Sequence, residues 1–343
     1  MTDTNEDKSK STHSEDLLTL EEVLPYLRNV QLGLPKAVVE EDNMLAIAPE
    51  VPRSELLGEI NRLPDEQMLM EYKTYRVYYG SVTQMPRVLD QIARLRELTF
   101  RAHQEGSGQP QDRDDFDLTY LHLFAWDTEA EAIVGAYRLG QTDRLREQDG
   151  NEGVYLAQMF DFSDEFYAGP PILEIGRSFV SPEYQRNTYS LYLLWCGISR
   201  YLLHHPKYRQ LYGVVSMSRL YDSRAMAVMR DVLLEPRDDV VAEAPYEPDL
   251  GTRWQDFLAE TRPMTMKDLS RIVKELEGNE RDVPVLIRHY HKLGARFHAA
   301  AVDENFNNTP GLLLRLNVPS IPRKYLKMYF GEGDLLERYL AFD

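Results

Sequence analysis

The sequence predicts a mixed α/β (α+β) protein whose central sheet has helices on both faces. Short runs of β-branched and aromatic residues form a meander of strands, and longer amphipathic runs then alternate with further strands. The chain has 343 residues, which is enough to bury a large core in one or two domains. Its 43% hydrophobic and 28% charged residues are ordinary for a globular protein.

The first part of the chain predicts a tail and a helical extension before the sheet begins. Residues 1–16 are polar and charged without periodicity, which predicts disorder. Residues 17–71 predict an extension with short helices near 20–27 and 54–60. The main domain is expected to cover residues 72–343.

The main domain begins with strands and one long helix. Residues 72–79 are rich in aromatic and β-branched side chains and predict a strand, and the apolar spacing of 85–103 predicts a helix. After a loop rich in Gly and Asp, residues 120–126 and 132–139 predict an antiparallel hairpin. Two more segments are expected to continue the same sheet: residues 155–160 and 172–180.

The second half of the chain predicts alternating helices and strands. Helical spacing appears in residues 189–203, 225–232, 266–276 and 285–293. Strands are expected at residues 212–217, 295–302 and 312–316. Residues 322–341 predict one closing amphipathic helix. Residues 237–260 carry seven acids and two arginines, and we expect this acidic segment to be a surface insertion rather than a core element.

One predicted strand carries two charges in an apolar setting. Residues 173–182 read as a buried strand that ends at a proline, yet they contain Glu174 and Arg177. Buried charges are costly unless they are paired or used. Residues three apart in an extended strand point to opposite faces, so these two cannot readily pair with each other. Each therefore needs another partner, and a substrate is one candidate.

The net charge of −17 is unevenly distributed along the chain. Residues 185–230 contain seven basic residues and one acid, which gives a local charge of +6. Such a segment either binds an anionic ligand or partner, or forms solvated helix faces. The sequence alone leaves both interpretations open.

Composition and spacing argue against several classes of protein. No apolar run approaches the roughly 20 residues that span a bilayer, and the N-terminus lacks a signal-peptide pattern. The lone Cys196 cannot form an internal disulfide, which favours a cytoplasmic protein. The histidine pairs lack the i,i+4 spacing that chelates a metal on a helix, so we expect no metal site. We also expect no nucleic-acid partner.

A series of short motifs gives the sequence a family resemblance. In chain order they are Arg96-Glu97-x-x-Phe100-Arg101, Glu105-Gly106-x-Gly108, Asp114-x-Phe116-Asp117, Tyr120-x-His122-Leu123, Gly135-Ala136-Tyr137-Arg138-Leu139, Glu174-x-Gly176-Arg177-Ser178, Leu194-Trp195 and Gly213-x-Val215-Ser216-x-Ser218. With the Val180-x-Pro182 strand end, they make about two thirds of the chain resemble the GNAT acyltransferase superfamily. The resemblance implies a GNAT-like mixed, splayed sheet.

Within that superfamily, the chain most resembles the hemolysin-like N-acyltransferases that make ornithine and glycine lipids. Acyl-homoserine lactone synthases are more distant relatives. The resemblance implies transfer of a (3-hydroxy)acyl chain from acyl carrier protein to the α-amine of an amino acid such as ornithine or glycine. The lyso-aminolipid product would pass to a partner O-acyltransferase at the membrane.

The loop after the Val180-x-Pro182 strand bears on the acyl donor. GNAT enzymes that use acetyl-CoA resemble one another in a Gly-containing loop that holds the pyrophosphate at a helix N-terminus. Residues 183–189 contain no glycine. A pantetheine arm carried on a protein has one phosphate and no adenine nucleotide, so this departure favours acyl carrier protein, with acyl-CoA as the alternative donor. We expect no bound cofactor.

The resemblance and the needs of N-acylation assign candidate roles to residues. An amine needs a proton acceptor, which makes Glu174 the candidate base and Arg177 its catalytic partner. The alternative for Glu174 is a structural ion pair with Arg177 or Arg138. The candidate substrate-binding residues are Arg96, Phe100, Asp114, Asp117, Arg138, Ser216 and Ser218.

Two further sets of charged residues have open alternatives. The arginines suit the acceptor's carboxylate or a structural lattice with acids. Asp114 and Asp117 suit the acceptor's ammonium groups or the capping of a loop. The basic segment supplies a predicted docking face for acidic acyl carrier protein, made of Arg186, Lys207, Arg209 and Arg219.

Two alternatives to an aminolipid enzyme remain for the whole protein, and the closing helix has two interpretations. The chain resembles a lactone-type signal synthase less closely than an aminolipid enzyme, and a non-catalytic scaffold that binds carrier protein or membrane is a further alternative. The closing helix either packs into the core or places its apolar stripe and basic residues against the inner membrane surface.

Overall fold

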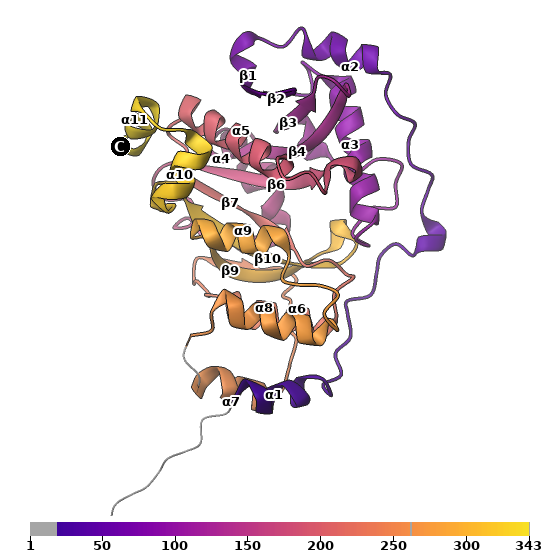
Figure 1. The fold of residues 1–343 in the computed structure, drawn as a ribbon, viewed down its shortest axis with the longest axis vertical. Helices are drawn as coiled ribbons and strands as arrows, with labels where there is room; N and C mark the ends of the chain where they lie inside the picture. The colour runs from indigo at the N-terminus through magenta and orange to yellow at the C-terminus, as the bar shows by residue number, and fades with distance from the viewer. Residues whose placement is uncertain (1–18, 261–262, 343) are drawn as a thin grey trace, which may run out of the picture.

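The computed structural model describes residues 19–260 and 263–342, and these form a mixed sheet of eight strands between layers of helices (Figure 1). The strand order is β1-β2-β3-β4-β6-β7-β10-β9, in which only β6 and β7 pair in parallel. The strands are β1 (Met68–Tyr72), β2 (Tyr75–Gly80), β3 (Leu121–Asp127), β4 (Ala132–Gln141), β6 (Ile172–Val180), β7 (Gln210–Ser216), β9 (Arg296–Asp303) and β10 (Thr309–Asn317). The predicted fold class is confirmed.

Alternating side chains of the strands pack against helices on opposite faces of the sheet. Val77 and Leu123 pack in one cluster with α5 (Ser190–His204), whereas Tyr78 and Phe124 pack in another with α3 (Pro86–Arg101). Successive side chains of a strand point to opposite faces, so α5 and α3 cover different sides of the sheet.

The other helices extend these two layers. Helix α2 packs on α3, and α10 packs on α5. Figure 1 shows α1 and α7 side by side, beyond α8. The bounds are α1 (Leu20–Leu27), α2 (Arg53–Ile60), α4 (Thr142–Asp149), α6 (Ser223–Leu233), α7 (Thr252–Glu260), α8 (Met266–Leu276), α9 (Val285–Leu293), α10 (Arg323–Phe330) and α11 (Asp334–Leu340).

Residues 155–160 do not continue the main sheet, so that prediction is wrong. Tyr155–Gln158 form the 3-10 helix η5, and β5 (Phe160–Phe162) pairs instead with β8 (Val240–Ala242) in a separate two-stranded sheet. The alternating Phe160 and Phe162 are buried against the face of the main sheet, in one cluster with Tyr212 of β7. Their periodicity was therefore a sign of packing onto a sheet rather than of pairing at its edge.

Two predicted single elements are each divided by a turn. The expected strand 72–79 is a hairpin of β1 and β2, because Lys73 takes a left-handed backbone with φ of 54°. The expected helix 322–341 is broken into α10 and α11 at Gly331 and Gly333, whose φ angles of 81° and 120° are incompatible with a continuous helix.

The sequence predicts that the acidic segment 237–260 is a surface insertion, but the structure also anchors it in the core. It contains β8 and α7, and it buries four apolar side chains in the main core: Tyr246, Leu250, Trp254 and Phe257. The indole N–H of Trp254 donates to the Asp231 carboxylate over 2.8 Å. The division of the chain into domains stays a prediction, and residues 1–16, predicted to be disordered, lie outside the described residues.

Candidate active site

The two parallel strands at the centre of the sheet separate and form a wedge. β6 and β7 are paired only from Ile172 to Glu174 on one strand and from Gln210 to Tyr212 on the other. At the point of divergence, a Cβ on Gly213 would lie 2.2 Å from the carbonyl oxygen of Ile175, so only glycine fits there. Glu174 therefore occupies the apex of the wedge.

β6 also contains a bulge just beyond this apex. Ala136 and Arg138 of β4 pair with Phe179 and Gly176, which leaves one extra residue on β6. Arg177 takes a left-handed backbone with φ of 45° within this bulge. Because the bulge interrupts strict alternation, Glu174 and Arg177 contact two rings of one buried cluster, Tyr212 and Tyr155, despite the opposite orientation expected for a regular strand.

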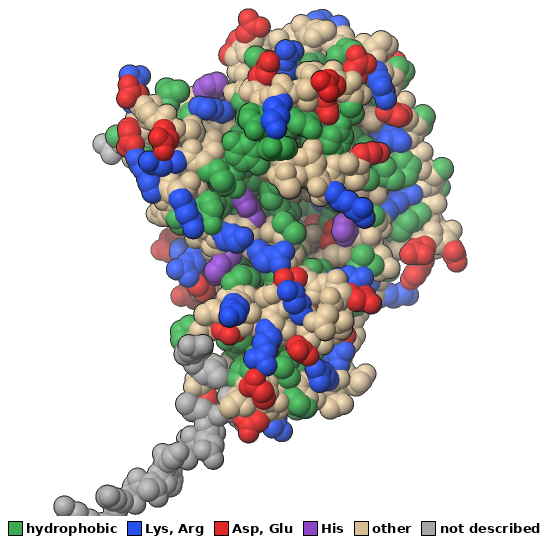
Figure 2. Space-filling model, viewed as in Figure 1, with side chains coloured by type: hydrophobic (Ala, Val, Ile, Leu, Met, Phe, Trp, Pro, Cys, Tyr) green, Lys and Arg blue, Asp and Glu red, His purple; other side chains and the backbone are tan. Residues whose placement is uncertain are grey.

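The wedge holds a cavity of about 510 Å³ that reaches both faces of the sheet. Tyr137, Leu194 and Tyr290 line it on the α5 side, and Phe100, Tyr155 and Phe306 line it on the α3 side. The cavity extends to the start of α9, and Figure 2 shows the surface hollowed beside this helix. The lining is mostly apolar, with a few polar groups converging on it, as is typical of ligand sites.

Glu174 is a buried carboxyl with a pKa suited to proton transfer. Its side chain is 2% exposed, and its Oε2 accepts a hydrogen bond of 3.1 Å from the hydroxyl of Tyr212. Burial raises the pKa of Glu174 to about 7, although Arg138 and the Tyr212 hydroxyl act in the opposite direction. A base with a pKa near neutral can exist as a carboxylate and still accept a proton effectively.

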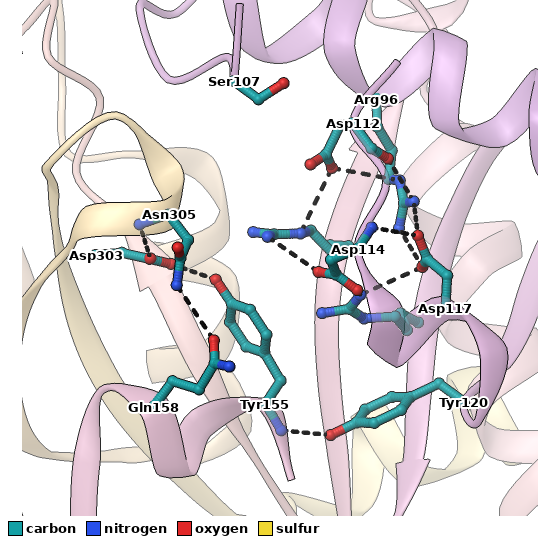
Figure 3. A network of polar contacts seen from close by, with 12 residues as sticks. Arg96, Ser107, Asp112, Asp114, Asp117, Tyr120, Tyr155, Gln158, Asp303 and Asn305 are labelled. Atoms are coloured by element: carbon teal, nitrogen blue, oxygen red, sulfur yellow. Dashed lines mark hydrogen bonds and ion pairs between the residues drawn. The ribbon is translucent and has the colours of Figure 1, made fainter. Parts of the chain in front are cut away.

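Three arginines and three aspartates form a buried lattice behind this carboxyl (Figure 3). Arg96 binds Asp117 through two hydrogen bonds of 2.7 and 3.0 Å. Arg138 contacts Asp114 at 2.5 Å and Asp117 at 3.2 Å. The charges balance, with Asp112 as the third acid, which is how buried ions are tolerated.

Asp117 and Arg177 lie on opposite sides of this lattice. Burial alone would raise the pKa of Asp117, but the guanidinium groups of Arg96 and Arg138 outweigh it and hold that pKa well below its usual value. The guanidinium of Arg177 lies 3.4 Å from a carboxylate oxygen of both Asp112 and Asp114.

Aromatic rings fix Arg177 on its other side. Its guanidinium carbon lies 4.7 Å from the ring centre of Tyr155 and 5.0 Å from that of Phe306. Figure 3 shows Tyr155 with Asp303, across from the aspartates, and the Tyr155 hydroxyl donates to Asp303 over 2.7 Å. Arg177 is thus held between a carboxylate pair and two rings.

The structure brings together some predicted site residues and places others behind them. Those that line the cavity are Glu174, Arg177, Phe100, Arg138, Ser216 and Ser218. Arg96, Asp114 and Asp117 are not among the lining residues, and the two aspartates also cap the 3-10 helix η3 (Asp115–Leu118). This geometry matches the lattice and capping alternatives, while any role toward substrate stays a prediction.

The four cations of the predicted docking face do not share one face. Lys207 and Arg209 precede β7, whereas Arg219 follows it, and β7 spans roughly 23 Å at ~3.3 Å per residue. Lys207 pairs with Asp143, and Arg209 donates to the carbonyls of Tyr339 and Leu340.

The remaining two cations lie at the opposite end of the strands. Arg219 donates to the carbonyls of Pro35, Asn307 and Asn308. Arg186 lies in the loop after β6 and is exposed. β6 and β7 run parallel, so this loop lies at the same end as Arg219, where the wedge opens. Only this end of the predicted docking face lies beside the cavity.

Sequence reasoning missed two buried acids in the cavity, Glu105 and Asp303. Glu105 lies after α3 and is 5% exposed, and we had treated it only as part of a motif. Its position is set by a tertiary contact rather than by a strand pattern, which is why periodicity gave no signal. Among the described residues there is no cluster of three or more His, Cys, Asp or Glu arranged to hold a metal.

Comparison with known proteins points to acyl transfer. Residues 95–195 match the acetyltransferase (GNAT) domain family. The chain is 29% identical over 293 residues to glycine N(alpha)-acyltransferase of Bacteroides thetaiotaomicron, covering 78% of this chain and 85% of the relative. It is also 29% identical over 255 residues to L-ornithine N(alpha)-acyltransferase of Agrobacterium fabrum, covering 70% of this chain and 78% of the relative.

The chain contains a GNAT domain and is an acyltransferase similar to these relatives. The resemblance inferred from the sequence motifs and the enzymatic nature of the protein are confirmed. A solved CoA-dependent acyl-homoserine lactone synthase aligns with this acyltransferase over 77% of this chain and 98% of its own. Its 15% identity and TM-score of 0.37 are too low to bear on substrate.

Proposed function

We propose that this acyltransferase attaches an acyl chain to the α-amine of an amino acid, with Glu174 as the proton acceptor. The observation that carries the proposal is the Glu174 carboxyl at the apex of the wedge, with a pKa of about 7. The names of its relatives, which are glycine and ornithine N-acyltransferases, support an amino acid as acceptor.

The reaction follows from the groups at the apex. Glu174 takes a proton from the acceptor amine, directly or through water, and the amine nitrogen attacks the thioester carbonyl carbon. The C–S bond then breaks, and the leaving thiolate takes up the proton held by Glu174 or one from solvent. β6 has no pairing with β7 beyond Glu174, so its backbone N–H groups, with Arg177 nearby, are suited to stabilise the oxyanion.

The loop after β6 supports a carrier-protein donor. Four of its backbone N–H groups already bond within the loop, those of Tyr184, Gln185, Asn187 and Tyr189, and the N–H of Ser190 at the start of α5 bonds back to Asn187. Few amides remain to hold a pyrophosphate, whereas a pantetheine arm on acyl carrier protein needs contacts to one phosphate only. We therefore infer a (3-hydroxy)acyl carrier protein as the donor.

Mass spectrometry of a reconstituted reaction tests this function. The full chain would be incubated with glycine or ornithine and with either 3-hydroxyacyl carrier protein or the matching acyl-CoA. We expect an N-acyl amino acid, formed faster from the carrier protein, and at least roughly 10²-fold slower with Glu174→Gln. The absence of acylated product with every amino acid and donor would overturn the proposal.

Membrane contact and a partner O-acyltransferase belong to the same proposal. The lyso-aminolipid product is amphipathic, so a peripheral position at the inner membrane would ease its transfer. Among the described residues, no helix is long and apolar enough to cross a bilayer. Arg323 and Lys327 of α10 pair with Glu337 and Glu332, so vesicle flotation is needed to test whether this end of the chain binds lipid.

A further inference from the structure

Glu105, a buried acid that sequence reasoning missed, is held rigidly at the α3 side of the cavity. The backbone N–H of Glu105 donates to the carbonyl of Phe100 over 3.0 Å, which folds the residue back onto the end of α3. Within the turn that this bond closes, the Ser218 hydroxyl donates to the His103 carbonyl, and the Asn307 amide donates to the Gln104 carbonyl. Glu105 is therefore fixed in place before any ligand binds.

Glu105 contributes an unsatisfied carboxyl oxygen to this cavity. Its Oε1 is buried and has no hydrogen-bond partner, and the buried hydroxyl of Thr99 is unpartnered in the same way. Both residues line the cavity, as does Ser216, whose hydroxyl lies beside the Glu105 carboxyl. Unsatisfied buried polar atoms are rare in native proteins, and a missing ligand is one explanation.

The chemistry of these three groups suits one kind of ligand. A primary ammonium has three N–H donors and no acceptor. A carboxylate and two hydroxyl oxygens provide three acceptors, one of them charged. Burial raises the pKa of Glu105 to about 8, and a bound ammonium would favour its charged form again.

The lining provides no other cation for Glu105. Arg138 and Arg177 already face the aspartates of the lattice, and burial lowers the pKa of the third basic lining residue, His103. No ion pair joins Glu105 to a basic side chain in residues 19–260 and 263–342. A cation that pairs with Glu105 would therefore come from a ligand.

The rise of strand β7 gives the separation of the backbone positions beside the two carboxyls. Tyr212 contacts Glu174, and Ser216 lies beside Glu105, four residues further along the same face of β7, which is about 13 Å at ~3.3 Å per residue. The two amines of ornithine are about 6 Å apart, since five bonds each advance roughly 1.25 Å. With a hydrogen bond of about 2.9 Å at each end, such an acceptor spans about 12 Å.

We propose that Glu105, Thr99 and Ser216 form a subsite for a primary ammonium, and that this acyltransferase selects a diamino acid of ornithine length. The inference rests on the proposed N-acylation of an amino acid, which it narrows to one class of acceptor. Glycine and other monoamino acids would leave the Glu105 carboxyl unpaired.

Comparing ornithine with norvaline tests the proposal, because norvaline lacks only the distal amine. With 3-hydroxyacyl carrier protein as donor, we expect the wild-type kcat/KM for ornithine to exceed that for norvaline by roughly 10- to 100-fold. Glu105→Gln should bring that ratio close to one, mainly by lowering kcat/KM for ornithine. Glu152→Gln removes an exposed acid on η4 (Gly150–Gly153) and should leave the ratio as in the wild type.

Several outcomes would overturn the proposal, and each is distinct from failure of the proposed function. Equal wild-type rates with ornithine and norvaline contradict it even if Glu105→Gln does not fold. An equal loss for both acceptors in folded Glu105→Gln makes Glu105 structural. A changed preference between 3-hydroxyacyl and unsubstituted donors assigns Glu105 to the acyl chain instead. In all three cases an N-acyl product still forms, whereas its complete absence would disprove the N-acylation itself.

Discussion

The hydroxyl of Tyr212 donates a 3.1 Å hydrogen bond to the Glu174 carboxylate at the last position where β6 and β7 are paired. The same pair of residues thus marks the end of the parallel ladder and the centre of the proposed chemistry. The phenol stabilises the charged carboxylate and partly counteracts the effect of burial on its pKa. The divergence of two strands therefore positions the base and tunes it.

Removing this phenol should shift the pH dependence of the reaction. In Tyr212→Phe the charged form of Glu174 loses a hydrogen bond, so its pKa rises by about one unit, as expected for a bond worth ~1.5 kcal/mol. The rising limb of kcat/KM should then move to higher pH. Tyr246→Phe, which alters a buried tyrosine elsewhere in the core, is the control. An unmoved limb in Tyr212→Phe would show that this bond does not tune the base.

The arginine–aspartate lattice should contribute strongly to stability. Asp117→Asn leaves Arg96 and Arg138 buried with one carboxylate fewer, which we expect to cost about 3–5 kcal/mol in the free energy of unfolding. Asp115→Asn changes an exposed residue of the same 3-10 helix and should cost less than about 0.5 kcal/mol. Urea unfolding at pH 7 measures both, and similar values for the two variants would contradict the lattice.

The same carboxylate predicts the direction of an acid effect. The pKa of Asp117 is depressed in the folded protein, so its contribution to stability is complete above the unfolded pKa of about 3.9 and is lost as the pH falls below it. Wild-type stability should therefore fall more steeply than that of Asp117→Asn between about pH 4 and pH 2. Parallel curves would show that Asp117 does not carry this dependence.

The placement of the basic residues divides the predicted docking face. Arg186 is exposed at the open end of the wedge, so Arg186→Glu should raise the KM for acyl carrier protein and flatten its dependence on salt. Lys207→Glu is a matched charge reversal at the other end of β7, and it should leave both quantities unchanged. A larger effect from Lys207→Glu would mean that the carrier docks on the far side.

Local sequence patterns predicted most elements because their side chains alternate between helix-covered faces. They also singled out Glu174 and Arg177, since charges within an apolar strand are visible without a structure. The bulge that turns Glu174 and Arg177 toward one aromatic cluster could not be predicted from the sequence, because nothing in the local pattern requires a left-handed backbone at Arg177.

Features that depend on tertiary contacts were beyond sequence reasoning. The burial of Glu105 follows from the fold of the chain after α3, and the acidic segment is anchored by Trp254, whose indole meets Asp231 at 2.8 Å. The spread of the four cations also depends on strand direction, since Lys207 and Arg219 are close in sequence but flank opposite ends of β7.

The most direct test of the account is the single-turnover rate of N-acylation as a function of pH, for wild type and Glu174→Gln. Only the carboxylate form of Glu174 can accept the proton, so the wild-type rate should rise with an apparent pKa near 7 and then level off. Glu174→Gln should lose this limb and react roughly 10²- to 10⁴-fold more slowly at pH 8, while remaining folded. A folded Glu174→Gln protein with the wild-type rate and the same limb would remove Glu174 from the chemistry.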